Sequence, residues 1–215
     1  MPAGLRAIKE GVGRRKGSHN ADFEATRTGL LELLGRRLLA PDGADASMRE
    51  LAEAAGVSTA TLRHYFPDRD VLVTAYLEHC HRQGTQWLLL VATEPLQPSA
   101  AESLRWTLGL IQLGLARGPL GKMHALGLRA GLESPGLGPA YLRTMLEPTL
   151  RCVEVRVERH QARGELLGRD PRLLALQLVS PLLLAMLHQH SLFGCDLRPL
   201  DVDALVNALV ASAGA

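Results

Sequence analysis

The stretch SMRELAEAAGVSTATLRHYF, residues 47–66, is the most informative part of the chain. It opens with a capping box, because a serine is followed three residues later by Glu50, and the two side chains can satisfy each other's backbone N–H groups. Apolar residues then recur at helical spacing. Gly56 ends this helix, since glycine takes the left-handed C′ conformation without steric cost. Ser58 can cap a second helix, which Pro67 ends. The stretch therefore predicts two short helices joined by a tight turn.

The second of these helices has one face suited to reading DNA. Its inner face is predicted to hold Ser58, Leu62, Tyr65 and Phe66. Small, polar and basic side chains then point outward, as major-groove reading by a supported helix requires. The residues expected to face the bases are Thr59, Ala60, Arg63 and His64, with Thr61 at the edge.

Around this unit the sequence resembles a known family. The residues that carry the resemblance are Gly43, Ser47, Leu51-Ala52, Ala55-Gly56-Val57-Ser58, Thr61-Leu62, Tyr65-Phe66-Pro67 and Leu72. Together they resemble the N-terminal helix-turn-helix of the TetR (tetracycline-repressor-like) family of bacterial regulators, over residues 23–77. Two positions depart from the family pattern, which has Tyr in place of Arg63 and Lys in place of Arg69. Because arginine is the commonest specific partner of guanine, the base preference does not follow by analogy.

The resemblance implies a set of phosphate contacts beside the base-reading residues. These are expected from Ser47, Ser58, Tyr65 and Arg69. The alternative is an ordinary helical hairpin, but a capped helix, a glycine turn, a second capped helix and a proline stop together disfavour it.

Composition is consistent with an all-α, DNA-binding protein without proving it. The chain has 215 residues, 47% hydrophobic but only 4% aromatic, so its core is built mainly from Leu, Ala and Val. No run alternates with period two, and Leu and Ala favour helix. Net charge is only +2, so the position of basic residues matters more than their number. Three cysteines without metal-type spacing fit a reducing cytoplasm.

The pattern of breaks divides the chain into four parts. Residues 1–19 are expected to form a flexible basic arm that stays solvated or contacts DNA. Residues 20–67 form the helix-turn-helix domain, and residues 68–94 a long connecting helix that enters both domains. Residues 95–215 then form a helical domain for ligand binding and dimerisation, with a kink expected at Pro148.

The C-terminal helices carry more apolar surface than a terminal hairpin usually buries. One runs to Phe193 from Pro171, and a second is traced by apolar residues at helical spacing from Val202 to Val210. In the TetR-like family the corresponding helices pair across a two-fold axis, so residues 170–213 are predicted to form a homodimer. The alternative is that both helices bury their apolar faces within one chain. The apolar stretch 173–187 is interrupted and falls short of a membrane span, so no membrane contact is expected.

The family also implies a small-molecule cavity among the middle helices. The bulky, polarizable and hydrogen-bonding residues of that region are Trp87, Trp106, Met123, His124, Tyr141, Met145 and Cys152. Each of them is more often core filler than a ligand contact, so the prediction concerns the region. A pocket of this kind is usually apolar, with a few placed polar groups.

No feature of the sequence indicates catalysis. The pairs His79/His81 and His188/His190 are two residues apart on predicted helices and point in different directions, whereas a shared metal usually needs i, i+4 spacing. No metal or cofactor is therefore predicted, and the chain is not expected to be an enzyme. The expected function is a cytoplasmic regulator that binds double-stranded DNA, a repressor released from a palindromic operator by a small apolar or amphipathic effector. The alternatives are a regulator that works through a protein partner without a ligand, and an α-helical enzyme that uses the histidines.

Overall fold

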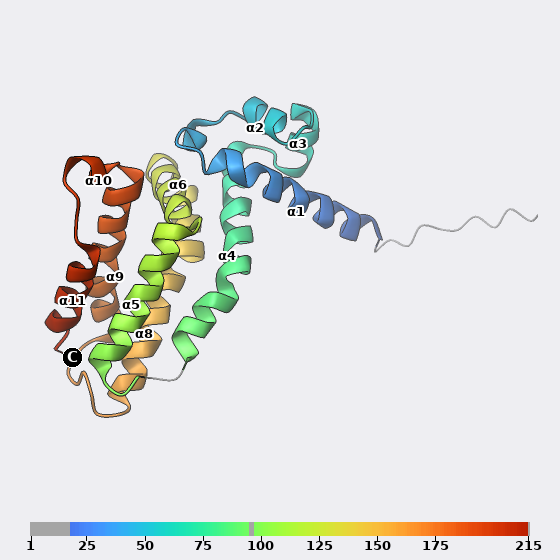
Figure 1. The fold of residues 1–215 in the computed structure, drawn as a ribbon. Coiled ribbons are helices and arrows are strands. Elements are labelled where there is room, and N and C mark those ends of the chain that lie inside the picture. The colour runs from blue at the N-terminus through green and yellow to red at the C-terminus, as the bar shows by residue number, and fades with distance from the viewer. Residues whose placement is uncertain (1–17, 95–96, 215) are drawn as a thin grey trace, which may run out of the picture.

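A computed structural model describes residues 18–94 and 97–214, and this part of the chain is helical with no strand (Figure 1). The all-α prediction is therefore confirmed. The N-terminal unit consists of α1 (Ser18–Leu38), a 3₁₀ turn (Gly43–Asp45), α2 (Met48–Ala54) and α3 (Thr59–Tyr65). Helix α1 begins two residues earlier than the sequence indicates, and residues 1–17 of the predicted arm lie outside the described part.

Helices α2 and α3 begin and end where the local sequence predicts. The capping box of Ser47 and Glu50 is present at the start of α2, and Ser58 caps α3. Gly56 has φ +68°, a backbone conformation that residues with a side chain rarely adopt. Gly43 allows a close backbone approach, since a Cβ there would lie 2.1 Å from the carbonyl oxygen of Leu38. The turns on both sides of α2 therefore depend on glycine.

Helix α4 (Arg69–Thr93), capped by Asp68, leads from this unit into a second bundle of helices (Figure 1). The bundle is formed by α5 (Ala100–Arg117), α6 (Leu120–Glu133), α7 (Leu137–Tyr141), α8 (Glu147–Gln161), α9 (Pro171–Met186), α10 (Gly194–Leu197) and α11 (Val202–Ser212). Its core lies between α5, α8, α9 and α11, where Leu108, Val157, Leu182 and Val210 are almost completely buried. A separate core joins α1–α4 to α6 and α7.

The irregularity expected at Pro148 takes the form of a π turn. Residues Leu142–Leu146 form this turn, in which the Glu147 N–H donates to the Leu142 carbonyl, five residues back. A proline inside a helix lacks one hydrogen bond and its ring crowds the preceding turn. The wider π turn directly before Pro148 accommodates the ring, so the chain continues from α7 into α8 as one helical rod.

A second π turn, Leu187–Ser191, extends α9. By length and composition, the combined helix Pro171–Ser191 could cross a membrane. The sequence alone predicts no span here, because the shorter stretch 173–187 is too short and too interrupted. A single helix of this kind is weak evidence for a membrane protein, because core helices share its composition. Here α9 packs against α5, α8 and α11 on one side, while Leu173 and Leu184 remain about two-thirds exposed on the other.

Candidate nucleic-acid interface

Helix α3 presents its outward residues to solvent, as its sequence predicts. The Thr61 N–H donates to Ser58 Oγ over 3.0 Å, which fixes the first turn of the helix. Leu62 is completely buried beneath it. Of the five residues expected to face the bases, four are exposed and Thr59 is half-buried. The face therefore has the polar and basic groups needed for base contacts, held on a rigid support.

The capping serines have local partners as well. Ser47 Oγ lies 2.7 Å from a carboxylate oxygen of Glu50, and hydrogen bonds from Ser47 lower the pKa of that carboxyl. Ser58 is exposed rather than on the inner face expected for it, since an N-cap lies at the edge of its helix. Both serines hold helix N-termini where phosphates commonly bind, so their phosphate contacts stay predictions.

The end of α3 is braced by an aromatic cluster that the sequence did not indicate. The Phe23 ring, from α1, lies 5.6 Å from the His64 ring and 4.7 Å from the Tyr65 ring, measured between centroids. The His64 and Tyr65 rings are themselves 5.0 Å apart. This packing fixes the orientation of the His64 and Tyr65 side chains. Arg63, which is exposed, takes no part in these ring contacts.

Arg69 has partners within the protein. Its guanidinium donates to the carbonyl oxygen of Ala46 over 3.2 Å and to that of Ala44. These carbonyls belong to the turn that leads into α2, so Arg69 ties the start of α4 to the helix-turn-helix. The phosphate contact of Arg69 stays a prediction, and its described contacts stabilise the packing of α4 against the turn before α2.

Two polar contacts join α6 to the DNA-reading unit. Arg129 pairs with Asp45 of the 3₁₀ turn, and Ser134 donates to Asp70 at the start of α4. The apolar core beneath them is continuous, because Leu126 and Ala130 of α6 pack with the residues of α1–α4. The reading unit is thus attached to the bundle through α6 and α7 as well as through α4.

The seven residues predicted to surround a ligand fall into two groups. In the first, His124 Nδ1 lies 2.9 Å from the hydroxyl of Tyr141, and both side chains are buried. Burial lowers the pKa of His124 to about 4 and raises that of Tyr141 to about 12, so the histidine is neutral at pH 7. Met123 and Met145 pack in the same core, which is shared with the DNA-reading unit.

The second group lies at the other end of α4. Cys152 packs there with Trp87 and Trp106, and burial raises the pKa of its thiol to about 12. The guanidinium of Arg156 covers one face of Trp106, 4.8 Å from the ring centroid. The single ligand region expected from the sequence is therefore divided between two packed clusters.

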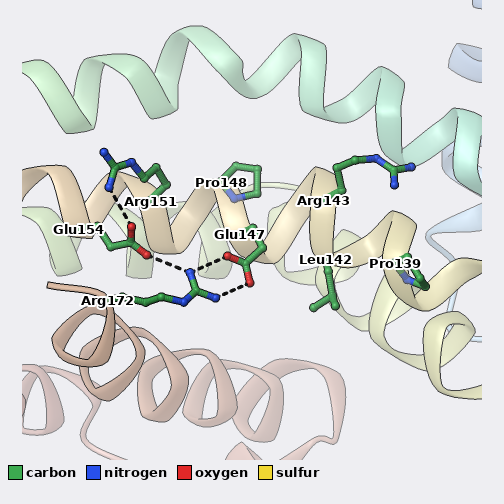
Figure 2. A pocket seen from close by; sticks show the side chains of 8 residues that line it. All are labelled: Pro139, Leu142, Arg143, Glu147, Pro148, Arg151, Glu154 and Arg172. Atoms are coloured by element: carbon green, nitrogen blue, oxygen red, sulfur yellow. Dashed lines mark hydrogen bonds and ion pairs between the residues drawn. The ribbon is translucent and has the colours of Figure 1, made fainter. Parts of the chain in front are cut away.

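A groove with a volume of about 610 Å³ lies elsewhere, on the outer side of α8 (Figure 2). Arg172, from the start of α9, lies between Glu147 and Glu154 of α8, with nitrogen–oxygen distances of 2.9 and 3.1 Å. Arg151 also pairs with Glu154. None of the seven predicted ligand residues lines this groove. Two of the three arginines that line the groove, Arg151 and Arg172, pair with its two glutamates.

Two arginines of α8 form contacts that the sequence offered no signal for. Arg156, although completely buried, donates to the carbonyl oxygens of Val91 and Glu94 over 2.7 and 3.0 Å. Arg159 donates to those of Ala92 and Glu94 over 3.0 and 2.8 Å. Cations favour the C-terminal end of a helix, where carbonyl groups lack helical partners. These arginines therefore hold the last turn of α4 against α8.

An exposed reading helix on a capped support, joined to a bundle of helices through α4, α6 and α7, defines the class of helix-turn-helix DNA-binding proteins. Comparison with known proteins supports this class. Residues 34–76 match the model of bacterial regulatory proteins of the tetR family. The helix-turn-helix unit and the start of α4 therefore match the tetR family, and the resemblance inferred from the sequence is confirmed. No curated protein matches the sequence.

Solved structures share the fold over nearly the whole chain. A protein from Mesorhizobium loti assigned to the tetR-family transcriptional regulators is 20% identical, over 89% of this chain and 96% of that chain, with a TM-score of 0.68. A Saccharomonospora viridis protein assigned as a transcriptional regulator, solved in complex with choline, is 19% identical over 86% and 94%, with a TM-score of 0.67. SmeT, the repressor of the Stenotrophomonas maltophilia multidrug efflux pump SmeDEF, is 18% identical over 89% and 90%, with a TM-score of 0.60. These neighbours are regulators rather than enzymes.

Proposed function

We propose that this protein is a cytoplasmic, homodimeric repressor that leaves a palindromic operator when a small apolar or amphipathic molecule binds between the helices of its C-terminal bundle. The observation that carries the proposal is the course of α4. Its first residues pack in the core of the DNA-reading unit, and its last residues pack beside Trp87 and Cys152. A change at one end of this helix therefore reaches the other.

The chemistry around the far end of α4 supports an apolar or amphipathic effector. Trp87, Leu88 and Leu110 are half-buried there, beside the buried Val91 and Cys152. Trp106 is stacked on one face by Arg156, which leaves Trp87 as the freer aromatic surface. A neighbour of the same fold binds choline and another represses an efflux pump, and both facts agree with control by small molecules.

The packing of four of the seven candidate residues supports a second function. His124, Tyr141, Met145 and Cys152 are all at most 5% exposed, so they act as core in the described conformation. A regulator that works through a protein partner, without an effector, would need no space among them. A ligand must therefore open this region to bind, and the binding energy must exceed the cost of opening it.

DNA binding is tested by selection from random duplexes. Each subunit has one reading helix, so a dimer should enrich a pseudo-palindrome whose half-sites are about one helical turn, or a multiple of it, apart. Arg63→Ala should weaken binding by roughly 1–3 kcal/mol if the arginine makes a bidentate base contact. Arg117→Ala, which removes an exposed cation from the end of α5, should bind as the unmodified protein does. Enrichment of asymmetric sequences alone would contradict the proposal.

Effector control is tested by titration in the presence and absence of the selected DNA. The two tryptophans, Trp87 and Trp106, provide an intrinsic fluorescence signal for screening small molecules. A true effector should lower DNA affinity by about 5- to 150-fold, and the DNA should weaken effector binding by the same factor, because coupling between sites is reciprocal. Equal effector affinity in both titrations would favour the ligand-independent candidate.

A further inference from the structure

Helix α4 is packed at its two ends and poorly covered between them. Its buried residues fall into one group that ends at Cys80 and a second group, Val91 and Ala92. None of the ten residues from His81 to Leu90, all of which the structure describes, is buried. The apolar contacts of this stretch are made by the half-buried Trp87 and Leu88 near its end. Because helices in proteins are held mainly by packing, the stretch before Trp87 is the least supported part of α4.

The two ends of α4 pack against different sets of neighbours. The first group shares a core with α1–α3, α6 and α7, where Leu72, Val73 and Leu77 are completely buried. The second packs against α8, and Arg156 and Arg159 hold its carbonyl oxygens from there. Each end therefore follows its own neighbours if these groups of helices shift relative to one another.

The middle of α4 also has weak helix formers. Gly84 costs about 1 kcal/mol relative to alanine inside a helix. No close contact requires a glycine there, since a Cβ at this position would meet nothing within 4 Å. Thr85 Oγ1 donates to the His81 carbonyl over 2.8 Å, a bond that often bends helices. In Figure 1 the axis of α4 changes direction between the reading unit and its far end.

We propose that Gly84 and Thr85 form a hinge that divides α4 into two segments, one fixed to the DNA-reading unit and one clamped to α8 by Arg156 and Arg159. This inference rests on the proposed function and deepens it, because it names the place where effector binding is converted into movement. An effector beside Trp87 then acts on the clamped segment, and the angle at the hinge decides how the reading helices are oriented. A single rigid rod would instead tilt as a whole.

Hydrogen exchange measured by mass spectrometry on the full-length protein tests the hinge without DNA or effector. The amides of residues 85–89 should exchange faster than those of residues 73–80 and 91–93. Gly84→Ala adds a good helix former in open space and should slow the exchange of residues 85–89 about fivefold. The matched control is Gly109→Ala in α5, which is also half-buried, inside a helix and without contacts within 4 Å. Gly109→Ala should leave the exchange rates of the α4 amides unchanged.

Two results of this experiment would overturn the hinge. The first is exchange of residues 85–89 that is as slow as exchange in the two packed segments. The second is equal slowing of α4 by both alanine variants, because the effect would then be global stability. Retained folding of the variants is checked by circular dichroism, and neither variant introduces a steric clash that would prevent it.

A second measurement uses the selected DNA. In the unmodified protein, DNA should slow exchange in α3 and in α4 up to Cys80, and leave residues 91–93 as they were. In the Gly84→Ala variant the helix is stiffer, so bound DNA should also slow the exchange of residues 85–93. Protection that reaches residue 93 equally in both proteins would overturn the hinge. Failure to obtain any binding DNA would contradict the proposed function alone, since the exchange pattern without DNA still decides the hinge.

Discussion

At the scale of single residues, the buried pair of His124 and Tyr141 makes stability depend on pH. Burial lowers the pKa of His124 from 6.5 to about 4. Between these values the unfolded chain binds a proton that the folded chain does not, so the free energy of unfolding falls as pH falls from 6.5 to 4. The full effect is about 3 kcal/mol, from 1.36 kcal/mol per pKa unit.

His124→Asn should reduce this pH dependence, because asparagine keeps a hydrogen-bonding group for Tyr141 and does not titrate. Urea midpoints measured at pH 7.5, 6.0, 5.0 and 4.5 compare the two proteins. The unmodified protein should lose more stability over this range. His160, whose pKa burial also lowers, is present in both and cancels in the difference. Parallel curves would show that His124 is not the group responsible.

Residues with local tasks could be predicted from the sequence, whereas residues with distant partners could not. The capping pair Ser47 and Glu50 and the turn glycine Gly56 act within three or four residues of their partners, so a short pattern reveals them. Arg156 bonds carbonyl groups more than sixty residues away, and Arg69 bonds carbonyl groups more than twenty away. Nothing in the local sequence distinguishes such arginines from solvated ones.

At the scale of secondary-structure elements, the contact between α6 and α7 depends on a glycine. A Cβ at Gly127 would lie 2.4 Å from Cδ2 of Tyr141, a buried ring with little room to move. Gly127→Ala should therefore destabilise the protein by about 1–3 kcal/mol, as overpacking typically does. Gly29→Ala in α1, where a Cβ meets nothing within 4 Å, should be neutral or stabilising. Denaturant midpoints of both variants give the comparison, and equal midpoints would contradict the packing argument.

Element boundaries followed the sequence where capping residues mark them. Asp68 and Asp170 cap α4 and α9, which begin where helices are predicted from the sequence, at residue 68 and at Pro171. The π turns before Pro148 and after Met186 could not be predicted, because they depend on how the helix fits its neighbours. The same holds for α10, which follows a left-handed residue, Phe193, in a segment expected to be the end of a helix.

At the scale of the whole molecule, the sequence predicted one region for the candidate ligand residues but could not indicate which faces of their helices meet. Periodicity places residues on a face of a helix, while the neighbour of that face is set by the fold. His124 and Trp87 were therefore assigned to one region, although the first packs with the reading unit and the second beside α8. The link through Arg129 and Asp45 was missed for the same reason.

The uncovered side of α9 leads to the last prediction, which concerns assembly. Leu205 and Leu209 of α11 are unsuitable for a charge, because both are half-buried and Leu209 packs against its own core. Leu184 is 65% exposed on the opposite side of α9 from that core, so a charge there should spare the fold. Leu173 is equally exposed, and Leu176 and Leu183 are half-buried on the same helix; apolar side chains that a monomer leaves uncovered can serve a protein interface.

Leu184→Glu should therefore give a folded monomer with greatly weakened DNA binding, since the two half-sites need two reading helices on one body. Leu132→Glu is the matched control, because Leu132 is 81% exposed at the end of α6, outside the predicted interface of residues 170–213. Sedimentation at micromolar concentration and binding to the selected DNA are measured for both variants and for the unmodified protein. A monomeric unmodified protein, or a Leu184→Glu variant that sediments as a dimer, would show that this face of α9 does not join two subunits.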